Sequence, residues 1–367
     1  MKALPLLLPL LLLLGACRHD EVIIEPEREP IISEADLAGF YLLNEGNMGS
    51  NKCTLDFCDL QSGEYERNIY SDRNPSAVKE LGDVGNDIGI YGSKMWMVIN
   101  CSHKVEVVDA RTARRLGQVD IPNCRYVRFH EGKAYVSSYV GPVKIDKNCP
   151  LGAVFEVDTT SLQITRRVDV GYQPEEFEFV GDFMYVANSG GYMAPDYETT
   201  VSVVRLSDFT EVMKIPVAIN LWRLRKDSRD MLWISSRGND LDIPSRIYML
   251  NPYTREVSGP IADVPCNNMA IRSDSLYFIS SSADKVYGII NTRTGQLVSS
   301  NFITDGTESN IRMPYGLALN PANGDVYLTD ARNYVSSGRV HCYTKDGVLK
   351  WTATTGDIPS AMAFLRR

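Results

Sequence analysis

The chain has 367 residues, of which 44% are hydrophobic and 23% charged, and its formal net charge is −8. An acidic chain without a cluster of Lys and Arg has no cation array to displace the counterions of a phosphate backbone, so we expect no nucleic-acid partner. A chain of this length often forms two domains, but no Pro/Ser-rich or charged boundary appears after residue 40. We therefore expect one domain over residues 37–367.

The amino terminus has the pattern of a lipoprotein signal peptide over residues 1–16. Lys2 precedes a Leu-rich run from Leu4 to Leu14, and the sequence Leu-Gly-Ala leads to Cys17. Small residues before a cysteine suit the lipoprotein signal peptidase, which would leave Cys17 as the lipidated first residue. The run is shorter than the ~20 residues that a membrane-spanning helix needs and contains Pro5 and Pro9. A lipid anchor is therefore favoured over a transmembrane helix.

Residues 17–36 are polar and contain prolines, which predicts a flexible acidic tether that builds no core. Asp20 and Glu21 follow the lipidated cysteine closely. Acidic residues at this place resemble the surface-export signal of Bacteroidetes lipoproteins. We therefore expect the protein on the outer membrane, facing the cell exterior and attached to the membrane only through its lipid.

A repeated pattern begins after the tether. A Tyr or Trp inside a short apolar run recurs seven times, at Tyr41, Trp96, Tyr135, Tyr185, Trp233, Tyr277 and Tyr327. A second apolar run follows most of them and ends in Asp or Asn, with Thr or Ser close behind: Asp59 and Ser62, Asp109 and Thr112, Asp158 and Ser161, Asn251 and Thr254, Asn291 and Thr294. Units of this kind, roughly 40 to 50 residues long, are typical of β-propeller blades.

One unit serves as the template for the others. We expect its four strands, from the innermost outward, at Asp87–Tyr91, Lys94–Ile99, Lys104–Asp109 and Arg115–Ile121. A single blade cannot bury both faces alone, so neighbouring blades must stack around an axis. The same division into four strands fits the segments 122–171, 172–217, 218–265, 266–306 and 312–357.

The two ends of the chain complete a seventh blade. The amino end supplies strands at Tyr41–Asn44, Thr54–Cys58 and Tyr65–Tyr70, and the carboxyl end supplies the innermost strand at Ala361–Leu365. Pairing the two ends closes the ring and removes exposed sheet edges. The prediction is an all-β protein, a seven-bladed β-propeller with four-stranded blades whose closing blade is shared between the two termini.

The mature chain has seven further cysteines, an odd number, and no pair has the spacing of a zinc site. They are Cys53, Cys58, Cys101, Cys124, Cys149, Cys266 and Cys342. Five of them, all except Cys58 and Cys342, fall in loops at one end of the ring. One disulfide among these five and a set of scattered small thiols are equally compatible with the pattern.

Function is expected in the loops, because the strands only make a scaffold. The loops that leave each second strand and those that lead into each blade share one face, where amide, aromatic and Arg side chains gather. The candidate ligand-binding residues are Asn44, Asn86, Asp87, Asn100, Arg125, Tyr126, Tyr139, Asn188, Tyr192, Trp222, Arg237, Asn268, Tyr315, Arg332 and Tyr334. For each Asn, a role in satisfying backbone groups is as plausible as ligand contact. Tyr192 and Tyr334 lie in long insertions where no core requires them, which favours binding.

Five segments carry a family resemblance: GFYLLNEGN (39–47), GDVGNDIGIYGSKMW (82–96), VINCSHKVEVVDA (98–110), GYQPEE (171–176) and VANSGGY (186–192). Over essentially the whole mature chain they resemble the YncE-like seven-bladed propellers, and within that group the BtuG-type surface lipoproteins of Bacteroides. The resemblance implies a protein that binds cobalamin or another corrinoid on the loop face and hands it to a TonB-dependent transporter of the outer membrane. It implies no enzymatic activity, no cofactor and no metal. A face rich in amide and aromatic groups suits such an amide-edged ligand.

Two other classes of function stay open. Calcium-dependent lactonases also place oxygen ligands at strand ends around a channel, a role that Glu45, Asn100, Asn188 and Asp330 could fill. Against an enzyme, the four His, at positions 19, 103, 130 and 341, form no recognisable catalytic or metal cluster. The other alternative is a surface scaffold that binds a protein partner.

Overall fold

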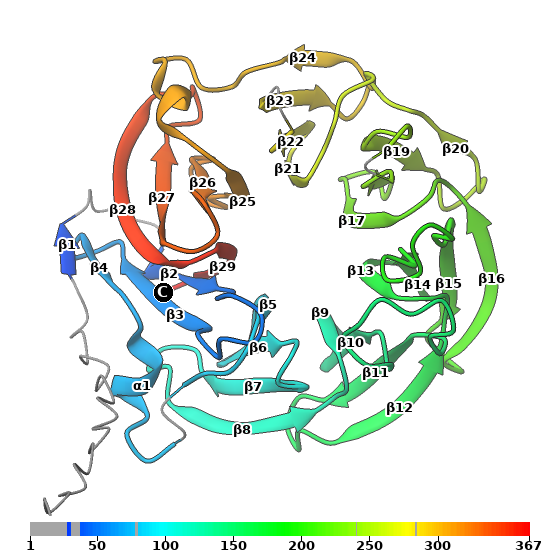
Figure 1. Cartoon of the computed structure of the whole chain (residues 1–367), viewed down its shortest axis with the longest axis horizontal. Helices are drawn as coiled ribbons and strands as arrows, with labels where there is room; N and C mark the ends of the chain where they lie inside the picture. The colour runs from blue at the N-terminus through cyan, green and yellow to red at the C-terminus, as the bar shows by residue number, and fades with distance from the viewer. Residues whose placement is uncertain (1–27, 31–36, 78–79, 240, 283–284) are drawn as a thin grey trace, which may run out of the picture.

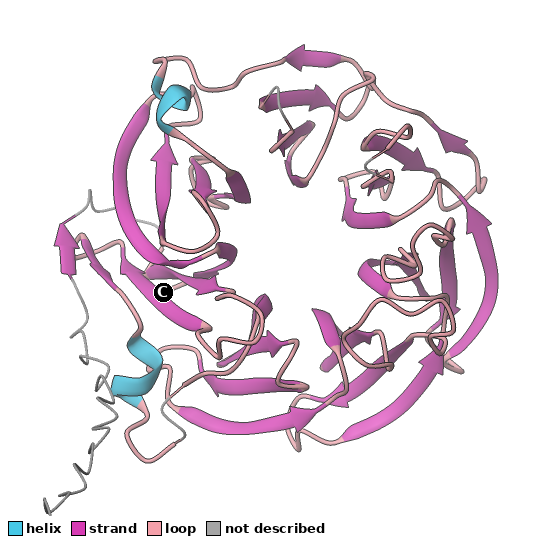
Figure 2. Ribbon diagram, in the orientation of Figure 1, coloured by secondary structure: helices cyan, strands magenta, loops and turns pink. Residues whose placement is uncertain are grey.

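Seven antiparallel sheets stand in a ring, each with one strand edge toward the centre and the other at the periphery (Figures 1 and 2). The computed structural model describes residues 28–30, 37–77, 80–239, 241–282 and 285–367. The expected fold, a seven-bladed β-propeller with blades of four strands, is confirmed. We number the blades from the closing blade, blade one, in chain order.

Six blades are continuous in sequence, and their sheets fall inside the segments that the repeat predicts. Blades two to four contain β5 (Gly85–Tyr91), β6 (Lys94–Ile99), β7 (Lys104–Asp109), β8 (Arg115–Asp120), β9 (Cys124–His130), β10 (Lys133–Ser138), β11 (Ala153–Asp158), β12 (Ile164–Asp169), β13 (Pro174–Val180), β14 (Phe183–Asn188), β15 (Thr200–Arg205) and β16 (Thr210–Pro216). Blades five to seven contain β17 (Leu221–Lys226), β18 (Leu232–Ser236), β19 (Arg246–Leu250), β20 (Val257–Ser258), β21 (Asn268–Arg272), β22 (Ser275–Ser280), β23 (Val286–Asn291), β24 (Leu297–Ser299), the 3-10 helix η1 (Thr307–Asn310), β25 (Pro314–Leu319), β26 (Val326–Asp330), β27 (Ser337–Tyr343) and β28 (Leu349–Asp357).

Blade one joins the two ends of the chain. Its four blade strands lie in the order β4 (Glu64–Glu66), β3 (Thr54–Asp59), β2 (Gly39–Asn44) and β29 (Pro359–Leu365), and the short strand β1 (Arg28–Pro30) adds a fifth strand beside β4 at the outer edge. The β2–β29 pair is antiparallel, with Leu43 opposite Ala361 and Gly39 opposite Leu365. The predicted closure by the carboxyl-terminal strand is therefore confirmed.

The short strand β1 pairs with β4 and lies within the segment expected to be a tether. The signal peptide, Cys17 and the rest of the tether lie outside the described residues. Among the residues that the structure does describe, no helix is long and apolar enough to cross a membrane.

The expected outer strand at Tyr65–Tyr70 is wrong in its second half. Strand β4 ends at Glu66, and the short helix α1 (Ile69–Arg73) follows. The buried Asp56 carboxylate accepts hydrogen bonds from the Tyr65 hydroxyl and the Asn68 backbone amide, each at 2.9 Å. Asn68 has a φ of 50°, so the chain turns there and sends Ile69 into the core.

The repeated signature has two physical roles. The aromatic residue of the second strand is core: Tyr41, Trp96, Trp233 and Tyr327 are fully buried between blades. The Asp or Asn that ends the third strand closes a turn, as in Asp109, whose Oδ1 accepts the backbone amides of residues 111 and 112 and the Thr112 hydroxyl.

Five cysteines are free thiols: Cys53, Cys101, Cys124, Cys149 and Cys266. Of the two alternatives for these five, the structure therefore has scattered thiols, with no disulfide joining any two of them. Burial raises the pKa of Cys124 to about 12 and that of Cys101 to about 11. Protonated thiols of this kind are poor nucleophiles and poor metal ligands.

Candidate functional site

A cavity of about 370 Å³ opens on the loop face, and we call it the mouth cavity. Its wall is formed by the loop after β2, by the beginnings of β5, β9, β17 and β25, and by the loops after β6, β14, β18 and β26. It is lined by Glu45, Gly46, Asn47, Met48, Val84, Asn86, Asn100, Cys101, Arg125, Tyr126, Tyr192, Trp222, Arg223, Arg237, Tyr315, Tyr334 and Ile358. Nine residues of the sequence-predicted set line it: Asn86, Asn100, Arg125, Tyr126, Tyr192, Trp222, Arg237, Tyr315 and Tyr334.

One buried carboxylate, Glu175 at the start of β13, holds two arginines of the wall. Arg125 Nη2 lies 3.0 Å and Arg237 Nη2 2.8 Å from its oxygens, and the Tyr139 hydroxyl donates a third bond. Burial by itself would raise the pKa of Glu175, but Arg125 and Arg237 outweigh this effect and hold the pKa below its ordinary value. Glu175 is therefore an anion that fixes blades three and five against each other.

The carboxylate of the next residue, Glu176, holds a second group of arginines. Its carboxylate pairs with Arg223 at 3.0 Å and with Arg225, both from β17. Burial opposes ionisation, but Arg225, Arg223 and Arg128 together lower the pKa of Glu176 to about 2. Two adjacent carboxylates of one strand in blade four thus orient guanidinium groups contributed by blades three and five.

The aromatic wall is built on Trp222. The guanidinium carbons of Arg223 and Arg237 lie 4.3 and 4.0 Å from the centre of its ring, within the range of cation–π attraction. Its indole Nε1 donates to the Tyr126 hydroxyl at 2.9 Å, which joins blade five to blade three. A ring held by hydrogen bonds and stacked cations loses little conformational entropy when a ligand packs on it.

Glu45 faces Tyr315 at the opposite part of the wall. The Tyr315 hydroxyl lies 3.0 Å from both carboxylate oxygens of Glu45. Burial raises the pKa of Glu45 to about 7, and the Tyr315 hydrogen bond and nearby Arg125 lower it only in part. The charge of this wall therefore changes near neutral pH.

The charges of the mouth cavity are largely compensated. Three lining arginines, Arg125, Arg223 and Arg237, face the carboxylates of Glu45, Glu175 and Glu176. The cavity therefore offers oriented polar groups and aromatic faces with little net charge, which suits a neutral polar ligand better than an ion.

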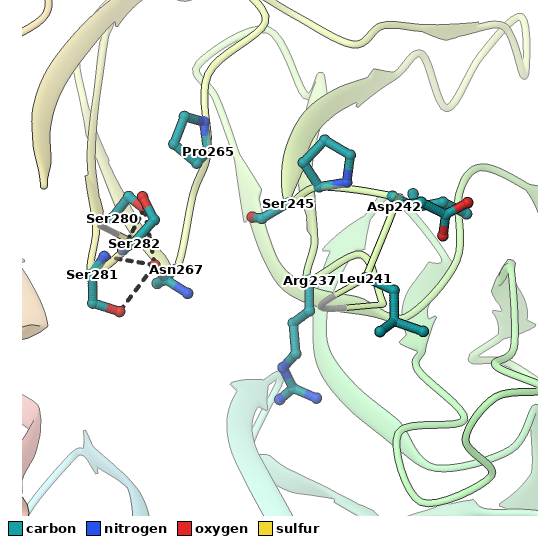
Figure 3. A pocket seen from close by; sticks show the side chains of 11 residues that line it. Arg237, Leu241, Asp242, Ser245, Pro265, Asn267, Ser280, Ser281 and Ser282 are labelled. Carbon is teal, nitrogen blue, oxygen red and sulfur yellow. Dashed lines mark hydrogen bonds between the residues drawn. The ribbon is translucent and has the colours of Figure 1, made fainter. Parts of the chain in front are cut away.

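A side cavity of about 570 Å³ adjoins the mouth cavity between blades five and six, and Arg237 lines both (Figure 3). On its far wall the side-chain oxygen Oδ1 of Asn267 accepts hydrogen bonds from the hydroxyls of Ser280 and Ser281 and from the Ser281 backbone amide. Pro244 and Pro265 make part of its lining. The two cavities together form a longer polar and apolar surface than the mouth cavity alone.

Six sequence-predicted residues do not line the mouth cavity, and four of them are buried polar groups that hold the scaffold. The Asn44 amide donates to Thr54, the Asn188 amide to Ser202, and the Asn268 amide to the Tyr315 carbonyl. Asp87 accepts from the Val127 amide and pairs with Arg128 at 2.8 Å. The remaining two are Tyr139, which lies buried behind the wall, and Arg332, which lines a different cavity.

A polar residue at the end of the second strand is a recurring structural device. The Asn100 amide donates to the Cys124 carbonyl at 2.8 Å, and the Ser236 hydroxyl donates to the Ile219 carbonyl at 2.6 Å. The first bond ties blade two to the start of blade three, and the second ties the end of β18 to the loop that leads into its own blade, blade five. For each Asn the sequence left two roles open, satisfying a backbone group or contacting a ligand. Asn100 has the first role, and it also borders the cavity.

Sequence reasoning undervalued two kinds of residue. Arg223, which lines the cavity, is not in the predicted set, and Glu175 and Glu176 enter the sequence analysis only through the segment GYQPEE. The available signal was a pair of adjacent carboxylates directly after Pro174, in a strand whose one further charged residue is Glu178. Their arginine partners lie about 50 residues away in the chain, so only the ring brings them together.

The oxygen ligands considered for a calcium-dependent enzyme are not gathered in one place. Glu45 and Asn100 border the mouth cavity, whereas Asn188 and Asp330 do not. Both Asp330 oxygens accept backbone amides, from residues 312 and 313. Within the described ranges, no group of three or more His, Cys, Asp or Glu is placed to hold a metal ion.

Comparisons with known proteins agree with this architecture. Residues 38–159 match the family model described as Domain of unknown function (DUF5074), which covers the strands from β2 to β11. A comparison with curated proteins finds no match.

Three solved structures illustrate the likeness of fold. A quinonprotein alcohol dehydrogenase-like protein of Bacteroides thetaiotaomicron is 16% identical, with a TM-score of 0.61 over 89% of this chain and 78% of that one. A hypothetical selenium-binding protein of Sulfolobus tokodaii is 10% identical, with a TM-score of 0.66 over 90% and 94%. A protein of unknown function from Bacteroides caccae is 11% identical, with a TM-score of 0.50 over 90% and 100%. At such identities the likeness concerns the fold alone and says nothing of the ligand. The class, a seven-bladed β-propeller protein, follows from the seven sheets of this chain.

Proposed function

We propose that this propeller is a binding protein for a polar, nearly neutral small molecule, and that its loop face is the binding surface. The mouth cavity carries the proposal. Its arginines are paired with buried carboxylates, its aromatic side chains are held by hydrogen bonds and stacking, and no metal-ligand cluster occurs in the described part of the chain. A preorganised wall whose arginines are already paired with carboxylates favours binding over catalysis.

The ligand class that fits best is a corrinoid. The sequence resembles BtuG-type propellers, and a corrinoid presents amide groups at its edge that can pair with Arg, Tyr and Asn. Such a ligand exceeds the drug-sized molecules that pockets of roughly 300–1,000 Å³ enclose. We therefore expect it to lie across the mouth cavity and to extend over Arg237 toward the side cavity.

Calorimetry with cyanocobalamin and the purified mature protein tests this proposal. We expect a saturable one-to-one signal that depends little on salt, with the ligand unchanged after prolonged incubation. Replacing Trp222, Tyr192 or Arg237 by Ala should weaken binding by about 1 to 3 kcal/mol where a buried partner is stranded. The matched control is Tyr253→Ala, because Tyr253 is an exposed tyrosine in the turn between β19 and β20.

Two results would reject the proposal that the ligand is a corrinoid. One is the absence of heat with any corrinoid while the protein is folded. The other is equal loss of binding in the Tyr253→Ala control. Calcium-dependent hydrolysis of a lactone or ester would instead support the alternative that the protein is an enzyme.

We also propose that lipidated Cys17 anchors the protein to the outer face of the outer membrane, where it delivers the ligand to a TonB-dependent transporter. Cys17→Ala should release the protein from the membrane fraction, because only the acyl chains hold it there. Protease added to intact cells should digest the wild-type protein, and protection from that protease would reject the outward orientation. The transporter should copurify from detergent extracts with the wild-type protein.

A further inference from the structure

Blade seven carries a second cavity, of about 270 Å³, whose lining differs in charge from the mouth cavity. We call it the blade-seven cavity. Arg312 precedes β25, Arg332 follows β26, Arg339 and His341 lie on β27, and Thr352 lies on β28. One carboxylate, that of Asp330, also borders it.

The cations of this cavity are not neutralised. In the described residues, Arg312, Arg332 and Arg339 have no carboxylate within ion-pair distance, unlike the three arginines of the mouth cavity. Both oxygens of Asp330 are engaged by backbone amides, and the Arg332 amide adds a further bond at 2.8 Å. Three guanidinium groups and one carboxylate leave a local charge of +3 − 1 = +2 in a chain of net charge −8.

A buried histidine gives independent support for a ligand. His341 is only 4% exposed, and its Nε2 has no hydrogen-bond partner. Its Nδ1 lies 2.9 Å from the Thr352 hydroxyl. If that hydroxyl donates, the neutral ring keeps its proton on Nε2, and this buried donor belongs to a residue that lines the cavity. A buried donor without a partner is costly and rare, so a group that accepts from it would stabilise the site.

We propose that the blade-seven cavity binds the phosphate group of a small anionic ligand, at a place separate from the mouth cavity. Guanidinium groups present paired N–H donors that match phosphate oxygens. A local charge of +2 matches a phosphate dianion, and the His341 Nε2 supplies a donor from the buried side. The site would let the protein hold an anionic ligand, or an anionic part of a ligand, that the charge-compensated mouth cavity does not favour.

The test is calorimetric titration of the full mature protein with inorganic phosphate in a chloride buffer at low ionic strength. We expect saturable one-to-one binding that weakens as salt is added. Arg312→Ala and Arg339→Ala should each lower the affinity at least tenfold. Both side chains are exposed, so these variants should keep the wild-type melting temperature in the absence of phosphate.

Three controls make the outcome decisive. Arg111→Ala removes another exposed arginine and should bind phosphate as the wild type does. Trp222→Ala should also bind phosphate normally, which separates this site from the mouth cavity and from the corrinoid proposal. Titration with glycerol phosphate and with succinate distinguishes a phosphate ester and a carboxylate from free phosphate.

Unsaturable heat, or equal affinity in the wild type, Arg312→Ala and Arg339→Ala, would overturn the proposal. Succinate binding with no response to either phosphate compound would overturn the choice of phosphate. A loss of phosphate binding in Trp222→Ala would place the anion in the mouth cavity and overturn the separate site.

Discussion

Glu175→Gln is the substitution that tests the electrostatic construction of the mouth cavity most directly. Gln keeps the size of the side chain but removes the charge that Arg125 and Arg237 share. The Glu175 side chain is fully buried, whereas those of Arg125 and Arg237 are 12% and 26% exposed. Two guanidinium groups would therefore lose their counterion in a place where water solvates them only in part.

Removing one partner of a buried ion pair typically costs about 3–5 kcal/mol. Gln can still accept one hydrogen bond, and the arginines keep some contact with water. We therefore expect the free energy of unfolding to fall by about 2–3 kcal/mol. Glu131→Gln is the matched control, because that side chain is 85% exposed and its ion-pair partner among the described residues, His130, lies 3.9 Å away. The control should change stability by no more than about 0.5 kcal/mol.

Urea unfolding at several pH values measures the free energy of unfolding of the wild type, Glu175→Gln and Glu131→Gln. The pKa of Glu175 is lowered in the folded protein, so its stabilising contribution is fully present above the unfolded-state pKa of about 4.3. The contribution is lost as the pH falls through the lower folded-state pKa. The wild type should therefore exceed Glu175→Gln in stability at pH 7, and the gap should narrow in acid. A gap below about 1 kcal/mol at pH 7, or one that widens in acid, would refute the assignment of Glu175 as the shared anion.

Two further predictions concern closure of the ring and the titration of Glu45. Deleting residues 360–367 removes most of β29 and exposes β2, so the cooperative melting transition should disappear. Deleting only residues 366–367 should preserve the transition. A native transition in the longer deletion would contradict closure of the ring by this strand. The pKa of Glu45 is raised to about 7, so the folded state binds a proton more tightly than the unfolded state, and wild-type stability should fall as the pH rises from about 4.5 to about 7. Because Glu45 is partly exposed, we expect roughly 1–2 kcal/mol of this loss to be absent in Glu45→Gln. Parallel pH profiles of wild type and variant would show that Glu45 does not titrate in this range.

The sequence alone was sufficient for the architecture, because the information that sets it is local and repeated. Strands β6 and β7 lie at Lys94–Ile99 and Lys104–Asp109 as predicted, since apolar runs and turn residues mark their ends. Closure through β29 also followed from the sequence, because one end of the chain lacked an innermost strand and the other end had a surplus one. The outer edge was less predictable. Helix α1 replaces part of a strand because the buried Asp56 accepts the Asn68 amide, and this contact is invisible in a pattern of apolar residues.

The candidate site depended on the tertiary structure in a different way. The sequence placed Asn44, Asn188 and Tyr192 on one face, but it could not tell that the two asparagines turn inward to hold strands while Tyr192 borders the cavity. Glu175 and Arg237 are 62 residues apart and meet only because the blades are arranged in a ring. Secondary structure is decided largely by the order of neighbouring residues, whereas burial, pairing of charges and the state of a carboxyl group are decided by which distant residues the closed ring brings into contact.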